Sequence, residues 1–236
     1  MAKIDREKWK IWGNVFDEHA IGVLQKMISQ GYFEGLRSPI SIGKEANVFT
    51  AEKKDGSLVI VKMYRLENCN FNKMYDYIKY DPRYESLKKQ RRKIIYAWVQ
   101  REYRNLLKAR EAQVRVPTPI VAQDNIIVME YIGDFDNIAE KLKNQDPENA
   151  ALFLKKTIAY IRLLYKKAGL VHGDLSPFNI LNYKDTPVFI DFSQATVLRN
   201  QMSEELLERD VKNVCQHFVR LGVKLDIAKA LKEIRR

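Results

Sequence analysis

Cysteine is scarce in this sequence, which has only Cys69 and Cys215 among its 236 residues. Two cysteines this far apart form neither a disulfide framework nor the closely spaced ligand pairs of a zinc site. We therefore interpret both as free thiols in a reducing compartment, and we expect no structural metal.

Long apolar segments are also missing. The N-terminal residues Met1-Ala-Lys-Ile-Asp-Arg-Glu-Lys8 contain no apolar signal region, and no uninterrupted apolar stretch is long enough to span a bilayer. We expect a cytoplasmic protein with no membrane partner. The hydrophobic content of 46% still suits one large domain or two small lobes with a real core.

Acidic residues are fewer than basic ones: the sequence has 30 Asp and Glu and 41 Lys and Arg, which gives a net charge of +11. Such an excess attracts polyanions, among them nucleic acid, nucleotides and acidic proteins. The densest group is the basic cluster Lys88-Lys-Gln-Arg-Arg-Lys93, near several tyrosines: Tyr75, Tyr77, Tyr80, Tyr84 and Tyr96. Basic residues beside aromatics suit RNA contact, whereas a solvated helix face is the alternative interpretation.

The spacing of apolar residues predicts the secondary structure. Helical periods cover about residues 17–30, 84–110 and 147–167, with Gly31 as a helix stop, while β-branched runs predict strands within 40–64 and 120–132. We expect three antiparallel strands in the first run, with Lys53-Lys-Asp-Gly56 as a hairpin turn, and two strands in the second.

Strands followed by helices indicate an α+β protein with two lobes. We place an N-terminal helical extension at residues 1–38, a first lobe at 39–132 and a second lobe at 133–236. The connection over residues 65–83 is long for a compact domain, and we expect a flexible loop there.

The run His172-Gly-Asp-Leu-Ser-Pro-Phe-Asn179, followed by Ile190-Asp191-Phe192, predicts phosphoryl transfer from ATP. Asp174 is the candidate base for a hydroxyl nucleophile, and Asn179 and Asp191 offer the oxygen ligands that Mg2+ prefers. A hairpin between these ligands, turning at Asp185-Thr-Pro187, would bring Asp191 back beside Asn179. The alternative is that the same residues merely cap a turn and end a strand.

Two charged residues of the first lobe lie on apolar faces. Lys62 shares a strand face with Leu58 and Ile60, and Glu102 falls in a helical apolar stripe. An isolated buried charge costs several kcal/mol, so we predict that Lys62 and Glu102 pair and that the lysine faces phosphate oxygens. The alternative is that Lys62 reaches solvent and Glu102 lies at the edge of the stripe.

The segment Ser41-Ile-Gly43-Lys-Glu-Ala-Asn-Val48 lies where a turn covering the phosphates is expected. It is not a Walker loop, since Ser38 and Glu45 replace the required Gly and Ser or Thr. It also has one glycine where the protein-kinase loop has three, so, taken alone, the segment is better explained as an ordinary hairpin turn.

Taken together, four stretches resemble the RIO family of atypical protein kinases, and its type-one branch in particular. They are Ser41 to Val48, the Asn-rich residues 68–72, Arg91-Arg-Lys-Ile-Ile95 leading into Trp98-Val-Gln-Arg-Glu-Tyr-Arg-Asn-Leu106, and Leu170 to Leu181. The resemblance runs from about residue 17 onward. It implies a two-lobe kinase-like fold.

The resemblance also implies site roles. Lys62, paired with Glu102, would hold the phosphates, and Met129, Glu130 and Ile132 would bind adenine. Ser41, Gly43 and Val48 would cover the nucleotide. Asp174 would be the base, Asn179 and Asp191 would hold Mg2+, and Asp191 would also accept a phosphoryl group as an acyl-phosphate.

The activity implied is that of a Mg-ATP-dependent serine/threonine kinase and ATPase that phosphorylates itself. Its partners would be the precursor of the small ribosomal subunit and its rRNA, during late maturation. The chain departs from ordinary protein kinases in having Ser193 after Asp191-Phe192, no Ala-Pro-Glu signature and a short remainder. We therefore expect a trimmed second lobe without activation segment or peptide-docking helices, and ATP hydrolysis or self-phosphorylation, with Ser86 as a candidate site.

Three other functions fit parts of the pattern. Small-molecule kinases of the aminoglycoside and choline type share the His-Gly-Asp motif but usually have larger insertions and acidic pockets. The minimal ATPase of tRNA threonylcarbamoylation shares it too, without the segment around Gly43. A catalytically silent RNA-binding adaptor is the third. It is disfavoured because the sequence has all five residues expected for phosphoryl transfer: Lys62, Glu102, Asp174, Asn179 and Asp191.

Overall fold

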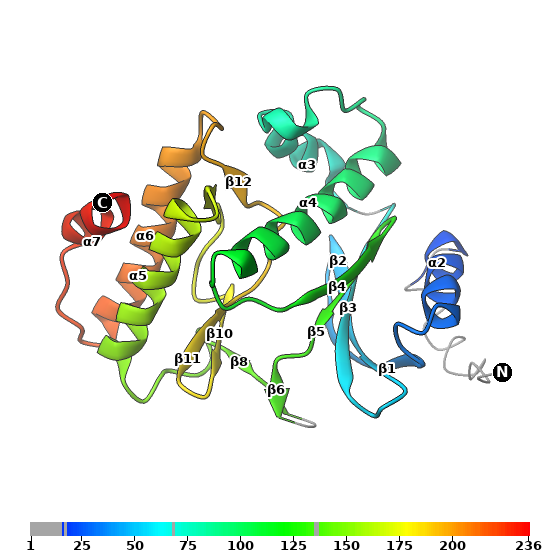
Figure 1. The fold of residues 1–236 in the computed structure, drawn as a ribbon, viewed down its shortest axis with the longest axis horizontal. Helices are drawn as coiled ribbons and strands as arrows, with labels where there is room; N and C mark the ends of the chain where they lie inside the picture. The colour runs from blue at the N-terminus through cyan, green and yellow to red at the C-terminus, as the bar shows by residue number, and fades with distance from the viewer. Residues whose placement is uncertain (1–15, 17, 68, 135–136) are drawn as a thin grey trace. The chain divides into compact units, whose positions relative to one another are not determined.

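The computed structural model describes residues 16, 18–67, 69–134 and 137–236, which fall into two compact units (Figure 1). Unit 1 takes the chain up to Asp76, with Leu87–Gln100 and Pro119–Tyr131. Unit 2 takes Tyr77–Ser86, Arg101–Thr118 and Ile132–Arg236. Residues 1–15 and Asp17 of the predicted extension, and Asn68 of the Asn-rich stretch, lie outside the described residues.

Unit 1 is built on an antiparallel sheet with strand order β1-β2-β3-β5-β4. Its strands are β1 (Gly35–Ile42), β2 (Ala46–Glu52), β3 (Leu58–Tyr64), β4 (Pro119–Gln123) and β5 (Ile126–Glu130). The predicted groups of three and two strands are confirmed. The first strand, however, begins inside the segment that we expected to be helical, because Gly35 pairs with Glu52 at the far end of β2.

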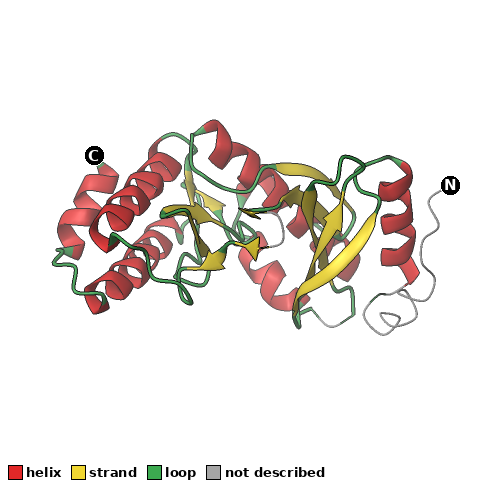
Figure 2. Cartoon of the chain, turned by 90° about the horizontal axis from the view of Figure 1, so that it is seen from below, coloured by secondary structure: helices red, strands yellow, loops and turns green. Residues whose placement is uncertain are grey.

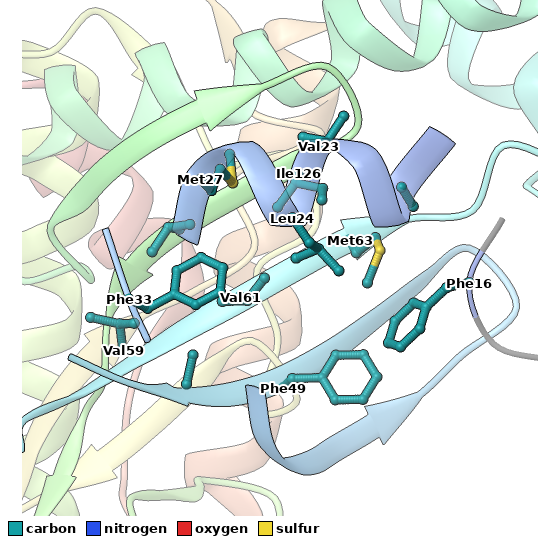
Figure 3. Packing of buried hydrophobic residues seen from close by; sticks show 13 residues of the cluster. Phe16, Val23, Leu24, Met27, Phe33, Phe49, Val59, Val61, Met63 and Ile126 are labelled. Atoms are coloured by element: carbon teal, nitrogen blue, oxygen red, sulfur yellow. The ribbon is translucent and has the colours of Figure 1, made fainter. Parts of the chain in front are cut away.

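The helix α2 (Glu18–Ser29) covers one face of this sheet. Figure 3 shows its apolar side chains Val23, Leu24 and Met27 packed with the strand residues Val61 and Met63. Gly31 ends the helix as predicted, because its φ of +78° suits glycine and the amide of Tyr32 bonds back to the carbonyl of Met27 at 3.2 Å.

The predicted loop over residues 65–83 is wrong along much of its length. It contains the helix α3 (Phe71–Ile78) and the 3-10 turn η1 (Pro82–Tyr84). Met74 and Ile78 are buried one helical turn apart, so a short apolar stripe organises a segment that looked polar.

The long helix α4 (Arg91–Glu111) begins seven residues later than we predicted from its period, which started at Tyr84. The residues between η1 and α4 are polar except for Leu87 and are mostly exposed, and the buried stripe begins only at Ile94 and Ile95. The helix contributes to both units, since Gln100 belongs to unit 1 and Arg101 to unit 2.

Unit 2 combines short strands with three helices that pack against one another, as Figure 2 also shows. Its helices are α5 (Ala150–Lys166), α6 (Ser203–Arg220) and α7 (Ile227–Arg235). Its strands are β6 (Gly133–Asp134), β7 (Asn137–Ile138), β8 (Glu140–Lys141), β9 (Leu170–Val171), β10 (Ile180–Tyr183), β11 (Thr186–Phe189) and β12 (Thr196–Val197). The helix predicted over residues 147–167 is confirmed, and within the described residues no helix is long and apolar enough to cross a membrane.

The predicted hairpin between Asn179 and Asp191 is confirmed as the antiparallel pair β10 and β11. Its turn is Lys184-Asp185, both at positive φ, and not the expected Asp185-Thr-Pro187. A two-residue turn of this kind needs positive φ at both positions. Pro187 is locked at negative φ and lies in β11 instead.

Replacing Leu24 by Ala should lower the free energy of unfolding by about 2–5 kcal/mol, because Leu24 is 0% exposed and its removal leaves a cavity between α2 and the sheet. Urea unfolding measures the change. The adjacent exposed Gln25→Ala is the control and should stay within about 0.5 kcal/mol of the starting protein. Equal, small effects of both substitutions would contradict the packing of α2.

Candidate functional site

The segment between β9 and β10 brings together two of the predicted site residues, Asp174 and Asn179. The Nδ2 atom of Asn179 donates to the main-chain carbonyl of Asp174 at 2.8 Å and to its Oδ2 atom at 3.2 Å. Asp174 is partly exposed, as a group that meets a substrate must be. The five-residue spacing therefore closes a small loop, residues 174–179, whose two ends share hydrogen bonds.

The β10–β11 hairpin returns the chain to this loop. The amide of Ile190 donates to the carbonyl of Asn179 at 3.0 Å, and Asp191 follows directly. Asp191 has a φ of +62°, a conformation that costs a non-glycine residue roughly 1–3 kcal/mol and that clusters at functional sites. Its Oδ1 atom accepts a hydrogen bond of 2.7 Å from the hydroxyl of Ser193.

The next four residues, Phe192 to Ala195, form a turn closed by the amide of Ala195 and the carbonyl of Phe192 at 3.2 Å. We call it the 192–195 turn. The Nε2 atom of Gln194 donates to Asp174 Oδ2 at 3.3 Å. This one turn thus contacts both candidate carboxylates, Asp191 through Ser193 and Asp174 through Gln194. The sequence analysis noted Ser193 only as a departure and missed Gln194.

His172 is a structural residue of the same loop. It is buried, its Nε2 atom donates to the carbonyl of Ile190 at 3.0 Å, and its ring packs edge-on against Phe192 at 4.7 Å between centroids. Gly173 must be glycine, because its φ is +79° and a Cβ atom there would lie 3.1 Å from the carbonyl of Gln194.

Asp210, on α6, is a further residue that the sequence analysis missed. Its buried carboxylate accepts the amides of Gly173 at 2.7 Å and of Leu175 at 2.8 Å, on either side of Asp174. The neighbouring Arg209 donates to the carbonyl of Gly173. Burial raises the pKa of Asp210 from 3.8 to about 7, although the two amide hydrogen bonds act to lower it.

Unit 1 carries the predicted phosphate-facing residues. Lys62 lies on the face of β3 opposite the α2 core and is partly buried, directly across from Val48 on one side and Ile127 on the other. Its Nζ atom lies 5.1 Å from the ring centroid of Tyr64. Ser41 pairs with Val48, which places both beside the turn that begins at Gly43.

Gly43 closes the turn between β1 and β2. Its amide donates to the carbonyl of Ala46 at 3.1 Å, and a Cβ atom at this position would lie 2.8 Å from the same oxygen. A side chain would therefore push the strands apart. The ordinary hairpin turn that we predicted as the alternative is present. Its single glycine is required because the backbone of Ala46 leaves no room for a side chain.

The predicted adenine-binding residues lie at the end of β5 and just after it. Met129 and Glu130 belong to unit 1, and Ile132 belongs to unit 2, where its carbonyl accepts the amide of Ala139 at 2.9 Å. Glu102 is 1% exposed on α4, as the stripe predicted, and belongs to unit 2. Its ion pair with Lys62 would link the two units and stays a prediction.

The oxygen donors of unit 2 fit a magnesium ion. Both hydrogen bonds of Asn179 to Asp174 use Nδ2, so Oδ1 is the end of the amide that can bind a cation. Asp191 offers a carboxylate. Mg2+ typically takes one or two such protein ligands and completes its shell with water and substrate phosphates. Among the described residues, no three His, Cys, Asp or Glu side chains gather closely enough to hold a metal by themselves.

Both cysteines are buried free thiols, as predicted. Burial raises the pKa of Cys69, and it raises that of Cys215 to about 11. A thiol held protonated is a poor nucleophile and a poor metal ligand.

Residues 47–230 match the family model of the RIO domain. The RIO-type serine/threonine-protein kinase Rio1 of Haloferax volcanii is 39% identical over 222 residues, 94% of this chain and 76% of that protein. Its counterpart in Methanocaldococcus jannaschii is 37% identical over 217 residues, 92% of this chain and 74% of that one. The human serine/threonine-protein kinase RIO1 is 34% identical over 214 residues, 89% of this chain and 38% of that protein.

Among solved structures, the Rio2 kinase from Chaetomium thermophilum matches with a TM-score of 0.68 and 22% identity, over 89% of this chain and 66% of that one. The complex of that kinase with ADP/Mg2+ and phosphoaspartate matches with a TM-score of 0.66 at the same identity, over 89% of this chain and 64% of that one. The predicted kinase-like α+β fold is confirmed. The lack of an activation segment and of peptide-docking helices stays a prediction.

The raised pKa of Asp210 predicts a pH dependence of stability. The folded protein binds the proton of Asp210 more tightly than the unfolded chain does. The contribution of this proton to the free energy of unfolding is therefore fully present below about pH 3.8 and is lost as the pH rises through about 7. The free energy of unfolding, measured by urea titration, should fall relative to that of Asp210→Asn by on the order of 4 kcal/mol between these limits. Parallel pH profiles of the two proteins would contradict the assignment.

Proposed function

The chain belongs to the RIO domain family, and from this we propose that it is a Mg-ATP-dependent atypical serine/threonine kinase and ATPase that phosphorylates itself. The observation that carries the proposal is the joining of Asp174, Asn179 and Asp191 by the loop 174–179 and the β10–β11 hairpin. One base and two metal ligands at adjoining positions are what phosphoryl transfer requires. The relatives named above are called serine/threonine kinases, which supports the same reaction.

Asp174 would act as the base. Asn179 and Gln194 both donate to its Oδ2 atom, and the amides on either side of it are held by Asp210. These contacts fix the carboxylate toward the substrate without neutralising it. A positioned base of this kind contributes roughly 10²–10⁴-fold to the rate of hydroxyl phosphorylation.

Asp191 would bind Mg2+ together with Asn179 and would also accept a phosphoryl group. The ion, when bound, neutralises charge on the phosphates. The hydroxyl of Ser193 holds Asp191 Oδ1, which orients the carboxylate. The bond that forms joins a carboxylate oxygen to the γ-phosphorus, the bond to ADP breaks, and water then hydrolyses the acyl-phosphate. A Rio2 kinase captured with ADP/Mg2+ and phosphoaspartate supports this step.

We further propose a cytoplasmic role in late maturation of the small ribosomal subunit, in contact with its rRNA. The net charge of +11 favours such a partner. In the basic cluster, Lys88 and Lys89 precede α4 while Arg91, Arg92 and Lys93 form its exposed first turn. Cations at a helix N-terminus are unfavourable, because they lie at the positive end of the helix dipole. Their clustering there destabilises the fold, and binding of an anion would offset this cost.

Two contacts order this cluster beside aromatic rings. The guanidinium of Arg91 donates to the carbonyl of Glu67 at 2.6 Å and lies 4.7 Å from the ring centroid of Phe71. The ammonium of Lys89 lies 5.4 Å from the ring of Tyr75. Stacked rings next to fixed cations suit single-stranded RNA, which offers bases and phosphates together.

A test of the reaction is to incubate the protein with Mg2+ and γ-labelled ATP and then treat it with hydroxylamine, which cleaves acyl-phosphates. We expect a hydroxylamine-labile label that is absent in Asp191→Ala, because the acceptor carboxylate is gone. Stable label that requires Asp174 would identify a hydroxyl acceptor, and mass spectrometry would show whether it is Ser86. Complete absence of label and of hydrolysis would favour the silent RNA-binding adaptor. Phosphorylation of amino-alcohols or sugars would favour a small-molecule kinase.

A test of the partner is to replace Lys88, Lys89, Arg91 and Arg92 by Ser. Affinity for a fluorescent single-stranded RNA should fall, and its dependence on salt should flatten by about 0.7 in log–log slope for each phosphate contact removed. Replacing four exposed lysines elsewhere, Lys155, Lys212, Lys229 and Lys232, removes the same charge and is the control. Equal losses in both variants would mean that only the net charge matters.

A further inference from the structure

Four polar side chains of unit 2 outside the proposed reaction form one network: Asp81, Arg83, Arg101 and Asn105. Asp81, Arg101 and Asn105 are each 0% exposed. Buried charge of this kind is rare and must be paired. The network joins the segment before η1 to the second half of α4, and it ends on the 192–195 turn.

Asn105 holds two carbonyls of that turn. Its Nδ2 atom donates to the carbonyl of Phe192 at 3.1 Å and to that of Ala195 at 2.7 Å. Arg101, one helical turn earlier, donates from a terminal nitrogen to the carbonyl of Gln194 at 3.4 Å. Two side chains on one face of α4 therefore fix three carbonyls of the turn.

Asp81 and Arg83 hold the side chains of Arg101 and Asn105 in place. The carboxylate of Asp81 accepts from Arg83 through three contacts, the shortest 2.6 Å, and lies 3.4 Å from Arg101 Nε. The guanidinium of Arg83 also donates to Asn105 Oδ1 at 2.9 Å. Because Oδ1 is bound by Arg83, the amide of Asn105 is held with Nδ2 toward the turn.

The end point of the network suggests its purpose. A buried ion pair is weak evidence for stability, since apolar replacements of the same volume are often as stable. Here the groups held are the carbonyls of Phe192, Gln194 and Ala195. The side chains of the same turn, those of Ser193 and Gln194, contact Asp191 and Asp174.

We infer that Asn105 and the buried Asp81–Arg101 pair are positioning residues, which set the geometry of the 192–195 turn and through it of the Asp174 and Asp191 carboxylates. The inference rests on the proposed function, in which those carboxylates carry the reaction. It assigns a positioning role to Asp81, which lies far from the site in sequence.

The test compares Asn105→Ala with Asn182→Ala, which removes another buried amide of unit 2 that does not contact the turn. In Asn105→Ala, kcat for ATP hydrolysis should fall about tenfold or more while KM for ATP changes less than about twofold. Hydrogen exchange should accelerate at the amide of Ala195. Unchanged exchange there, or an equal loss of kcat in the control, would overturn the inference.

A double-mutant cycle separates positioning from general destabilisation. If Asn105 acts through the turn, then its effect on kcat should largely disappear once Ser193→Ala and Gln194→Ala together have removed the contacts of the turn with Asp191 and Asp174. Fully additive effects would overturn that route. Because exchange needs no ATP, a chain that hydrolyses no ATP would refute the proposed function while exchange still decides whether Asn105 holds the turn.

The double variant Asp81→Leu with Arg101→Met probes the ion pair. It replaces both buried charges by apolar groups, so the folded state should persist by urea unfolding. The variant should nevertheless show a reduced kcat, because it lacks the hydrogen bond from Arg101 to the carbonyl of Gln194. Full activity in a stably folded double variant would overturn the role of the pair.

Discussion

The two hydrogen bonds from the amides of Gly173 and Leu175 to the buried carboxylate of Asp210 are the constraint on which the catalytic half of this protein depends. Asp174 lies between those amides, so its backbone cannot move without breaking one of them. The arrangement is costly, because burial of Asp210 opposes its charge. The two amide hydrogen bonds offset part of this cost, and they hold the loop 174–179 in place.

Around this fixed loop, unit 2 repeats one arrangement: buried polar side chains bind the irregular backbone. His172 binds the carbonyl of Ile190, and Asn105 binds two carbonyls of the 192–195 turn. Irregular backbone has amides and carbonyls that no helix or strand satisfies, so side chains must supply the partners. Arg101, which is fully buried on α4, is one of those partners.

Much of the architecture could be predicted from periodicity. The strand pattern of residues 40–64, the helix stop at Gly31 and the buried position of Glu102 all follow from local spacing and backbone preference. Two of the wrong expectations have separate causes. The loop 65–83 holds a short helix because Met74 and Ile78 find a surface to pack against, and the hairpin turned at Lys184-Asp185 because Pro187 cannot adopt positive φ.

The sequence by itself predicted the proposed chemistry, because the spacing of Asp174, Asn179 and Asp191 is that of one base and two metal ligands. Only the tertiary structure decided how these groups are held. Asp210, Gln194 and Asn105 act across 20 to 90 residues of chain. Asp210 and Asn105 bind backbone atoms, and Gln194 binds the carboxylate of Asp174. Such contacts leave no periodic pattern in a sequence, because the same type of polar residue can either face solvent or bind a distant part of the chain.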